Sequence, residues 1–321
     1  PSKLTSLHEH VDKVILMQEL NEYLARVKKG TAPGISGIVP ELWAHAGPLA
    51  RQELLDILNN ALRDGEVPKK WFYKAIRPLA KTDTAVGLED IRPIALMNTE
   101  QKLLTGILTD RIAAIWNNND ILNAKQMAFL QGRGCYQAIE RVRGLLLHAE
   151  HHHKPCHQLF LDLAKAYDSV EYWALEDTMR GLGIPDRVLT LMSKLDEGAQ
   201  AKLLMGRTDQ THWIKLGRGC PQGEVMSPLR FIAWMNLLLE IIDEWRDDNG
   251  QPVGYSLGDG RRYPGQAFCD DGWFVADTRE DLQTICNIVS AFCELYKVKI
   301  NAGKSYYTVG GEDTDPDKGK R

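Results

Sequence analysis

The stretch Phe268-Cys269-Asp270-Asp271-Gly272 places two adjacent aspartates between two apolar runs. Residues 267–269 lead into the pair and residues 273–276 follow it, which is the pattern of a tight β-hairpin with its charges at the turn. Neighbouring carboxylates repel each other, and setting them against buried strands is costly unless a cation neutralises them. Taken alone, the stretch also fits an ordinary Asp-Gly hairpin.

A second apolar strand also ends in an aspartate. It reads Leu159-Phe160-Leu161-Asp162-Leu163 and continues through residues 164–170 as Ala-Lys-Ala-Tyr-Asp-Ser-Val. Two strands that deliver carboxylates to one point form an oxygen-ligand site suited to Mg²⁺, the ion of phosphoryl-transfer sites. The sequence therefore predicts a divalent metal site built from Asp162 and the Asp270-Asp271 pair.

Both stretches belong to an ordered series of motifs. The chain resembles the polymerase core of reverse transcriptases from non-long-terminal-repeat (LINE-type) retrotransposons. Residues 161–170 resemble motif A of that family, 218–229 motif B (Arg-Gly-Cys-Pro-Gln-Gly-Glu-Val-Met-Ser-Pro-Leu), 268–271 motif C and 298–304 motif D. Each motif alone is a weak or moderate signal, whereas their ordered combination is specific.

The N-terminal half extends the resemblance. Residues 29–38 resemble the Gly-rich segment before the fingers, 77–81 and 90–96 resemble the finger motifs, and 126–135 resemble the segment that leads into the palm. The match thus runs in order over about residues 28 to 308.

The resemblance implies an α+β fold. It consists of a polymerase palm, which is an antiparallel sheet with helices on one face, and an interleaved fingers subdomain. The implied divisions are 1–135 for an N-terminal extension and the fingers, 136–170 for the first palm segment, 171–217 for an insertion, 218–309 for the second palm segment and 310–321 for a flexible tail. We expect the thumb to be absent from this chain, and the thumb and endonuclease regions to belong to a larger polypeptide.

The resemblance also implies a reaction. Such an enzyme adds dNTPs to the 3′-OH of a DNA or RNA primer on an RNA template, with two Mg²⁺ ions for which Mn²⁺ can substitute. Asp162, Asp270 and Asp271 are the implied catalytic metal ligands. Asp162 and Asp270 would bind both ions directly, and Asp271 would be a looser ligand.

Further roles carry over to motifs A and B. Tyr167 is implied to lie beneath the incoming sugar and to exclude ribonucleotides, with a core tyrosine as the alternative. Gln222 and Gly223 are implied to steady the nucleotide, the glycine because it lets the backbone approach closely. The next residues, Glu224-Val225, differ from the common Asp-Pro, which leaves the local shape of this loop open.

Three cations complete the implied site. Arg92 and Lys81 are the candidates to clamp the triphosphate, a task suited to the planar donor fork of arginine. Lys304 aligns with the motif D lysine, which would donate a proton to the leaving pyrophosphate as general acid. A solvated surface lysine is the alternative at position 304.

Apolar periodicity predicts the elements that carry these motifs. Helices are expected over residues 4–27, 41–63, 99–116, 136–150, 171–182, 186–197, 227–246 and 279–296. Strands are expected over 73–80, 200–205, 211–216 and 304–309, with a turn at 207–209. Asp277-Thr278 is placed to cap the last helix.

Charge, hydropathy and cysteine content indicate which partners and which compartment to expect. The formal net charge is −4, which gives little nonspecific affinity for nucleic acid, although basic clusters such as Lys69-Lys70 occur locally. No apolar run approaches the ~20 residues of a membrane span. The six cysteines include no Cys-x-x-Cys pair, so we expect reduced thiols in an intracellular protein. We expect it to act in the nucleus or cytoplasm, with no secretory signal and no membrane partner.

Two other classes of protein share parts of this pattern. RNA-dependent RNA polymerases have comparable aspartates but lack the Pro-Gln-Gly and Ser-Pro found within residues 221–228. Non-catalytic scaffolds with a reverse-transcriptase-like fold lose the metal carboxylates, which are all present here.

A run of His and Cys residues between 148 and 157 matches no common zinc spacing and fits a solvated connector better.

Overall fold

The computed structural model describes residues 3–84, 87, 90–204, 211–258 and 260–311. The chain divides into two compact units, each made of two stretches of sequence. The first unit comprises Pro1–Asn118 with Glu171–Arg230, and the second comprises Asn119–Val170 with Phe231–Arg321. The turn predicted at 207–209 and the tail from 312 onward lie outside the described residues.

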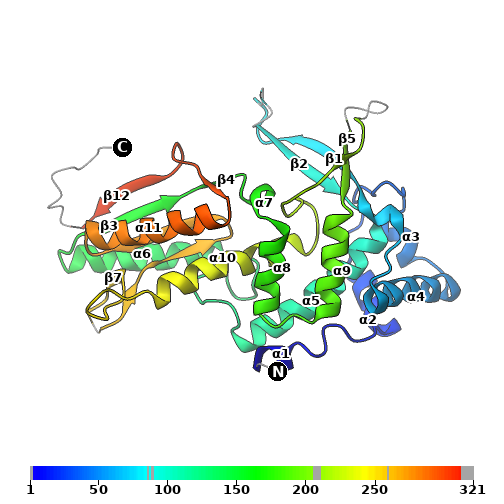
Figure 1. Cartoon of the computed structure of the whole chain (residues 1–321), viewed down its shortest axis with the longest axis horizontal. Helices are drawn as coiled ribbons and strands as arrows, with labels where there is room; N and C mark the ends of the chain where they lie inside the picture. Colours follow the sequence, from blue (N-terminus) through cyan, green and yellow to red (C-terminus); the bar gives the residue numbers. More distant parts are fainter. Residues whose placement is uncertain (1–2, 85–86, 88–89, 205–210, 259, 312–321) are drawn as a thin grey trace. The chain divides into compact units, whose positions relative to one another are not determined.

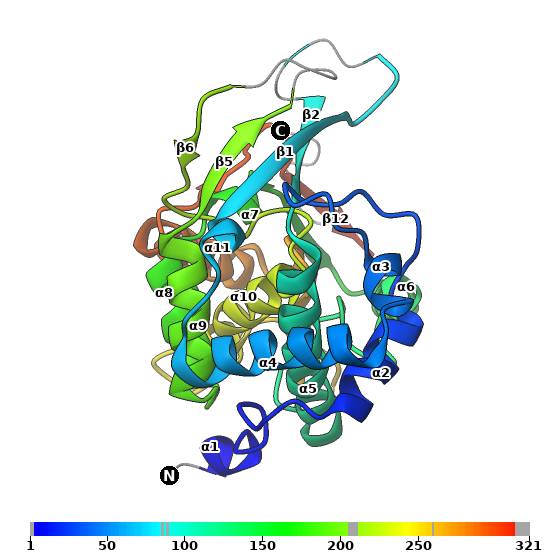
Figure 2. The ribbon, with the colours of Figure 1, turned by 90° about the vertical axis from the view of Figure 1, so that its right-hand side faces the viewer.

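A mixed four-stranded sheet, in the order β2-β1-β5-β6, organises the first unit. Its strands are β1 (Tyr73–Ala80), β2 (Ile91–Leu96), β5 (Gln200–Leu203) and β6 (Ile214–Lys215). Strand β1 is antiparallel to β2 and parallel to β5 (Figure 2). The strand predicted over 73–80 is therefore confirmed.

Helices make up the rest of the first unit. They are α1 (Lys3–Leu7), α2 (Met17–Arg26), α3 (Pro40–Ala44), α4 (Pro48–Asp64), the 3₁₀ turn η1 (Lys69–Phe72), α5 (Thr99–Asn119), α8 (Tyr172–Gly181) and α9 (Asp186–Glu197). None of the described helices in either unit is both long enough and apolar enough to cross a bilayer.

Two expected helices are broken in the structure. The single helix expected over 4–27 is wrong, because the chain between α1 and α2 is not helical. In this segment the carbonyl groups of Val11 and Lys13 accept hydrogen bonds from the Arg111 side chain (2.9 and 2.7 Å). The helix expected over 41–63 stops at Ala44 and restarts at Pro48. Proline disfavours helical backbone at the residue before it and suits the first turn of a new helix.

An antiparallel sheet in the order β12-β3-β10-β9 organises the second unit. Its strands are β3 (Cys156–Leu161), β9 (Gly265–Phe268), β10 (Asp271–Ala276) and β12 (Tyr306–Gly310). Short ladders pair β4 (Leu163–Ala164) with β11 (Lys299–Ile300), and β7 (Tyr255–Ser256) with β8 (Arg262–Tyr263). The helices are α6 (Cys135–His151), α7 (Ala166–Ser169), α11 (Arg279–Leu295) and most of α10 (Ser227–Glu244) (Figure 1).

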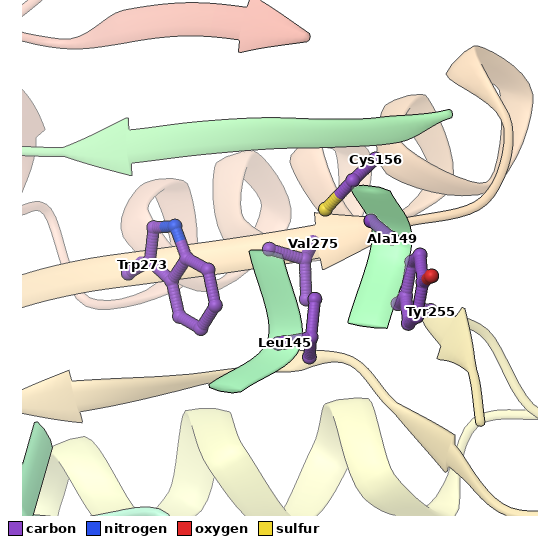
Figure 3. Close-up of a cluster of buried hydrophobic side chains, with 6 residues drawn as sticks. All are labelled: Leu145, Ala149, Cys156, Tyr255, Trp273 and Val275. Carbon is purple, nitrogen blue, oxygen red and sulfur yellow. The ribbon is translucent and has the colours of Figure 1, made fainter. Parts of the chain in front are cut away.

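Both faces of this sheet are covered, whereas the sequence predicted helices on one face. On one face, α6 contributes to an apolar cluster formed by Leu145, Ala149, Cys156, Tyr255, Trp273 and Val275 (Figure 3). Successive strand residues point to opposite faces, so Phe274 and Ala276 point away from this cluster. Both are nevertheless fully buried, and α11 contacts β10 and β3. A strand that is apolar on both faces needs cover on both.

Helix α11 begins where the sequence predicted a cap. The Thr278 side chain accepts a hydrogen bond from the backbone N–H of Asp281 (3.1 Å). Such a bond satisfies one of the free donors in the first helical turn. Helix α11 is thereby fixed at the end of β10, the strand that begins with Asp271.

Candidate active site

The three predicted metal ligands lie at one end of the second sheet. Asp162 directly follows β3, Asp270 lies in the turn between β9 and β10, and Asp271 begins β10. The antiparallel register pairs Gly272 with Leu161, so its next step sets Asp271 opposite Asp162. Residues opposed in an antiparallel pair point to the same face. The register therefore gathers carboxylates that are more than 100 positions apart in the sequence.

Electrostatics show that these carboxylates are close enough to interact. The pKa of Asp271 is raised, first by burial and then by the negative charges of Asp270 and Asp162. Burial and like charges both favour the neutral form of a carboxyl group. The end of the sheet therefore carries a concentrated negative charge that a bound cation would relieve.

The donor set fits a hard cation such as Mg²⁺ or Mn²⁺, which prefers carboxylate oxygens. Within the described residues, no three His, Cys, Asp or Glu side chains already converge into a metal cage. Mg²⁺ commonly keeps several waters and uses one or two carboxylates together with substrate phosphates.

The turn that carries Asp270 is tight. Strands β9 and β10 pair Phe268 with Asp271, so only Cys269 and Asp270 form the loop. The predicted hairpin is present, but Gly272 lies in β10 and not at the turn. Cys269 takes the left-handed conformation at φ 59°, which is uncommon for a residue with a side chain.

A turn in the motif D-like segment holds the backbone of Asp162 on both sides. The Asp162 N–H donates to Ser305 Oγ (3.2 Å), and its carbonyl accepts from the Asn301 N–H (2.8 Å). The Ser305 hydroxyl in turn donates to the Asn301 carbonyl (3.0 Å). Neither Ser305 nor Asn301 was predicted to have a role, because nothing in their local sequence indicates a partner so distant. Lys304 lies in the same turn with an exposed side chain.

Tyr167 packs against the aspartate hairpin. It lies in α7, directly after Lys165 and Ala166, where the chain turns through a left-handed residue at Lys165 (φ 50°). Its hydroxyl is 3.0 Å from Cys269 Sγ, and its ring stacks on Phe231 with centroids 4.4 Å apart. Burial raises the pKa of the Cys269 thiol to about 12, so the thiol stays protonated.

In the first unit, the motif B-like loop is attached to β2. The Gln222 carbonyl accepts a hydrogen bond from the Ala95 N–H (2.7 Å). Gly223 adopts φ 105°, and a Cβ at this position would lie 2.6 Å from the Ala95 carbonyl oxygen. Only glycine combines this conformation with so close an approach to β2.

A buried ion pair explains the unusual Glu224. Its carboxylate lies 3.8 Å from Lys74 Nζ on β1, and both side chains are 1% exposed. Ser227, at the start of α10, adds a hydrogen bond to the same carboxylate (3.4 Å). Glu224 therefore ties the loop to β1. Lys74 was not predicted as its partner, because the two residues are far apart in the sequence.

The cations proposed to bind phosphate share one face of the hairpin formed by β1 and β2. Arg92 is paired with Leu79, and Lys81 follows two residues after Leu79, so the alternation of the strand sets Lys81 and Arg92 on one face. Arg77 lies on this same face by the same alternation, and all three side chains are exposed. From the sequence, Arg77 was placed in a finger motif without a role of its own.

The predicted site residues belong to both units. Asp162, Asp270, Asp271, Tyr167 and Lys304 belong to the second unit, and Lys81, Arg92, Gln222 and Gly223 belong to the first.

Comparison with known proteins identifies the family. The model for the reverse transcriptase (RNA-dependent DNA polymerase) family matches residues 79–316, so this chain belongs to the reverse transcriptases. Its relatives include the Pol polyprotein of retrotransposable element R2DM from Drosophila melanogaster, with 28% identity over 94% of this chain and 27% of the relative. Another is the probable RNA-directed DNA polymerase of transposon BS from the same organism, with 24% identity over 91% of this chain and 32% of the relative. The predicted resemblance to non-long-terminal-repeat retrotransposon polymerases is confirmed.

Solved structures support the fold alone. Telomerase from Candida Tropicalis matches with a TM-score of 0.54 at 12% identity, over 76% of this chain and 42% of that one. A second telomerase structure from this organism gives a TM-score of 0.56 at 10% identity, over 83% of this chain and 49% of the telomerase chain. The chain spans about a quarter to a third of the length of the two retrotransposon relatives named above.

Proposed function

We propose that this chain is the fingers-and-palm core of an RNA-directed DNA polymerase that adds dNTPs to a primer 3′-OH on an RNA template. The observation that carries the proposal is the placement of Asp162, Asp270 and Asp271 at one end of the antiparallel sheet by the pairing of β3 with β10. Nucleotidyl transfer requires such a group of carboxylates to neutralise metal and phosphate charge.

Residues 1–135 are proposed as the N-terminal extension and fingers, and residues 136–170 with 218–309 as the palm, most of which lies in the second unit. The division of the chain at Val170 and Glu171 supports this assignment, because the motif A segment ends there. In the whole protein we propose that this core works with further regions, including a thumb and an endonuclease. The six free cysteines support an intracellular setting.

The proposed roles follow the chemistry of each side chain. Asp162, Asp270 and Asp271 would hold the divalent ions, which when bound activate the primer hydroxyl and neutralise the triphosphate. Tyr167 would lie beneath the sugar and exclude a 2′-hydroxyl. Lys304 would donate a proton to the leaving pyrophosphate, since its exposed amine lies in the turn that holds Asp162.

The first unit would bind the nucleotide. Gln222 would steady its sugar and base from a loop that Gly223 allows to approach β2. Lys81 and Arg92 would bind the triphosphate, and Arg77 adds a third positive charge on the same face. Three cations on one exposed face suit a polyanionic ligand.

The test is primer extension on an RNA template with Asp162→Asn, Asp270→Asn and the control Asp281→Asn. Asp281 is an acid of the second unit that pairs with Arg262. We expect the first two variants to lose at least a thousandfold in kcat with unchanged circular dichroism, because each loses a ligand charge, and the control to retain activity. Activity within tenfold of the parent in either folded variant would refute the assignment. Preferential use of ribonucleotides would indicate an RNA polymerase instead.

A further inference from the structure

We propose that Gln126 is a positioning residue that holds the turn carrying Asp270. Gln126 belongs to the second unit and lies outside every role assigned above. The inference rests on the proposed function in one respect, namely that Asp270 is a metal ligand.

The backbone around Gln126 is docked on β9. The Ala267 N–H donates to the Lys125 carbonyl (3.0 Å), and the Met127 N–H donates to the Ala267 carbonyl (2.8 Å). These two bonds form a parallel bridge between Gln126 and Ala267. Gln126 is thereby fixed beside the strand that leads into the aspartate turn.

The Gln126 side chain reaches the turn itself. It is fully buried, and its Oε1 accepts hydrogen bonds from the N–H of Cys269 (3.2 Å) and the N–H of Ala128 (3.1 Å). Because backbone N–H groups can only donate, the oxygen of the carboxamide must be the atom that faces them. One oxygen therefore joins the segment before α6 to the residue directly before Asp270.

The turn depends on this acceptor. Cys269 is the first residue of a two-residue loop, and its left-handed φ of 59° is unfavourable for a residue with a side chain. Strained backbone persists only where the surrounding structure holds it, and a buried N–H needs an acceptor. Gln126 provides that acceptor, so its loss should release the turn and with it the carboxylate of Asp270.

Gln126 also carries a cost to stability. Its Nε2 is buried and has no hydrogen-bond partner within the described part of the chain. An unsatisfied buried amide is unfavourable, and residues that break a local packing rule gather at functional sites. A neutral amide also accepts hydrogen bonds without adding a negative charge beside three aspartates.

The experiment compares Gln126→Leu with Gln266→Leu. Gln266 is a matched control because it is buried in β9 and also makes two side-chain hydrogen bonds, to the Ala138 carbonyl (2.8 Å) and from the Tyr263 hydroxyl (3.0 Å). Mn²⁺ affinity is read from the free-ion electron paramagnetic resonance signal, which needs no turnover. Tm, kcat and the KM for dNTP are measured alongside.

We expect both leucine variants to lower Tm, but only Gln126→Leu to weaken Mn²⁺ binding and kcat, each about tenfold or more, with KM for dNTP within about threefold. If Gln126→Leu does not fold, Gln126→Asn replaces it, because its shorter side chain cannot reach both N–H groups.

Unchanged Mn²⁺ affinity in Gln126→Leu, or an equal loss in Gln266→Leu, would overturn the inference. Failure of the proposed function has a different signature. In that case the parent would bind Mn²⁺ but extend no primer, and the comparison of Mn²⁺ affinities would still decide the role of Gln126.

Discussion

The hydroxyl oxygen of Tyr167 lies 3.0 Å from the sulfur of Cys269, two residues that are 102 positions apart in the sequence. This contact joins α7 to the turn between β9 and β10. One face of the ring is covered, because Tyr167 and Phe231 are stacked within 11° of parallel. The ring that is proposed to select the sugar is thus held by the hairpin that carries Asp270.

Replacement of Tyr167 by alanine should increase the use of ribonucleotides. Exclusion of a 2′-hydroxyl by steric overlap is relieved by truncation. We expect the ratio of kcat/KM for dGTP over GTP to fall at least tenfold, equivalent to ~1.4 kcal/mol. Tyr167→Phe keeps the ring and removes the hydroxyl that contacts Cys269, so its ratio should match that of the parent. An unchanged ratio in Tyr167→Ala would make Tyr167 a packing residue.

Gly223→Ala should damage the motif B-like loop. A Cβ there would lie 2.6 Å from the Ala95 carbonyl oxygen, and φ 105° is strained for alanine. We expect a loss of at least ~1 kcal/mol in unfolding free energy and a raised KM for dNTP, since the hydrogen bond between Gln222 and Ala95 must shift. Gly217→Ala is the control, because a Cβ there would meet no atom within 4 Å. Equal behaviour of the two variants would contradict the prediction.

The buried pair of Lys74 and Glu224 should show strong coupling. Removal of one partner leaves an uncompensated buried charge, which costs ~3–5 kcal/mol, whereas replacement of both by apolar residues is often tolerated. We therefore expect Lys74→Met and Glu224→Leu each to be more destabilising than the double variant, as measured by urea unfolding. Additive losses would show that the charges do not interact. Disruption of the exposed pair Arg63–Asp64 should leave the unfolding midpoint unchanged.

Buried His8 should make stability depend on pH. Burial lowers its pKa, opposed by a hydrogen bond to the Leu4 carbonyl. The Trp116 indole N–H donates to His8 Nε2 (3.0 Å), so this nitrogen must be unprotonated. The pKa of His8 in the folded state therefore lies below the unfolded value of ~6.5. The contribution of neutral His8 to folding stability is complete above pH ~6.5 and is lost as the pH falls toward the folded-state pKa.

The measurement is the unfolding free energy between pH 7.5 and 5, compared in the parent, His8→Gln and His10→Gln. We expect His8→Gln to reduce the fall in stability on acidification, by at most ~1.4 kcal/mol per pH unit. His10 is exposed and should have no effect. Parallel curves for the parent and His8→Gln would exclude His8 as the source.

The sequence by itself determined the family and much of the local structure. The strand at Tyr73–Ala80, the helix from Thr99, the cap at Thr278 and the order of the four motifs were all readable from periodicity and residue type. These signals are local, because a helix or strand repeats its buried positions within a few residues.

Only the tertiary structure decided which distant residues meet. The bond between Gln126 and Cys269 spans 143 positions, and the Lys74–Glu224 pair spans 150. The break between α1 and α2 likewise depends on Arg111, about 100 positions away. Such contacts follow from strand register and packing, and a one-residue change of register turns every side chain to the other face. Residue type alone therefore nominated the carboxylates, but the register that pairs Leu161 with Gly272 brought Asp162 and Asp271 to one end of the sheet.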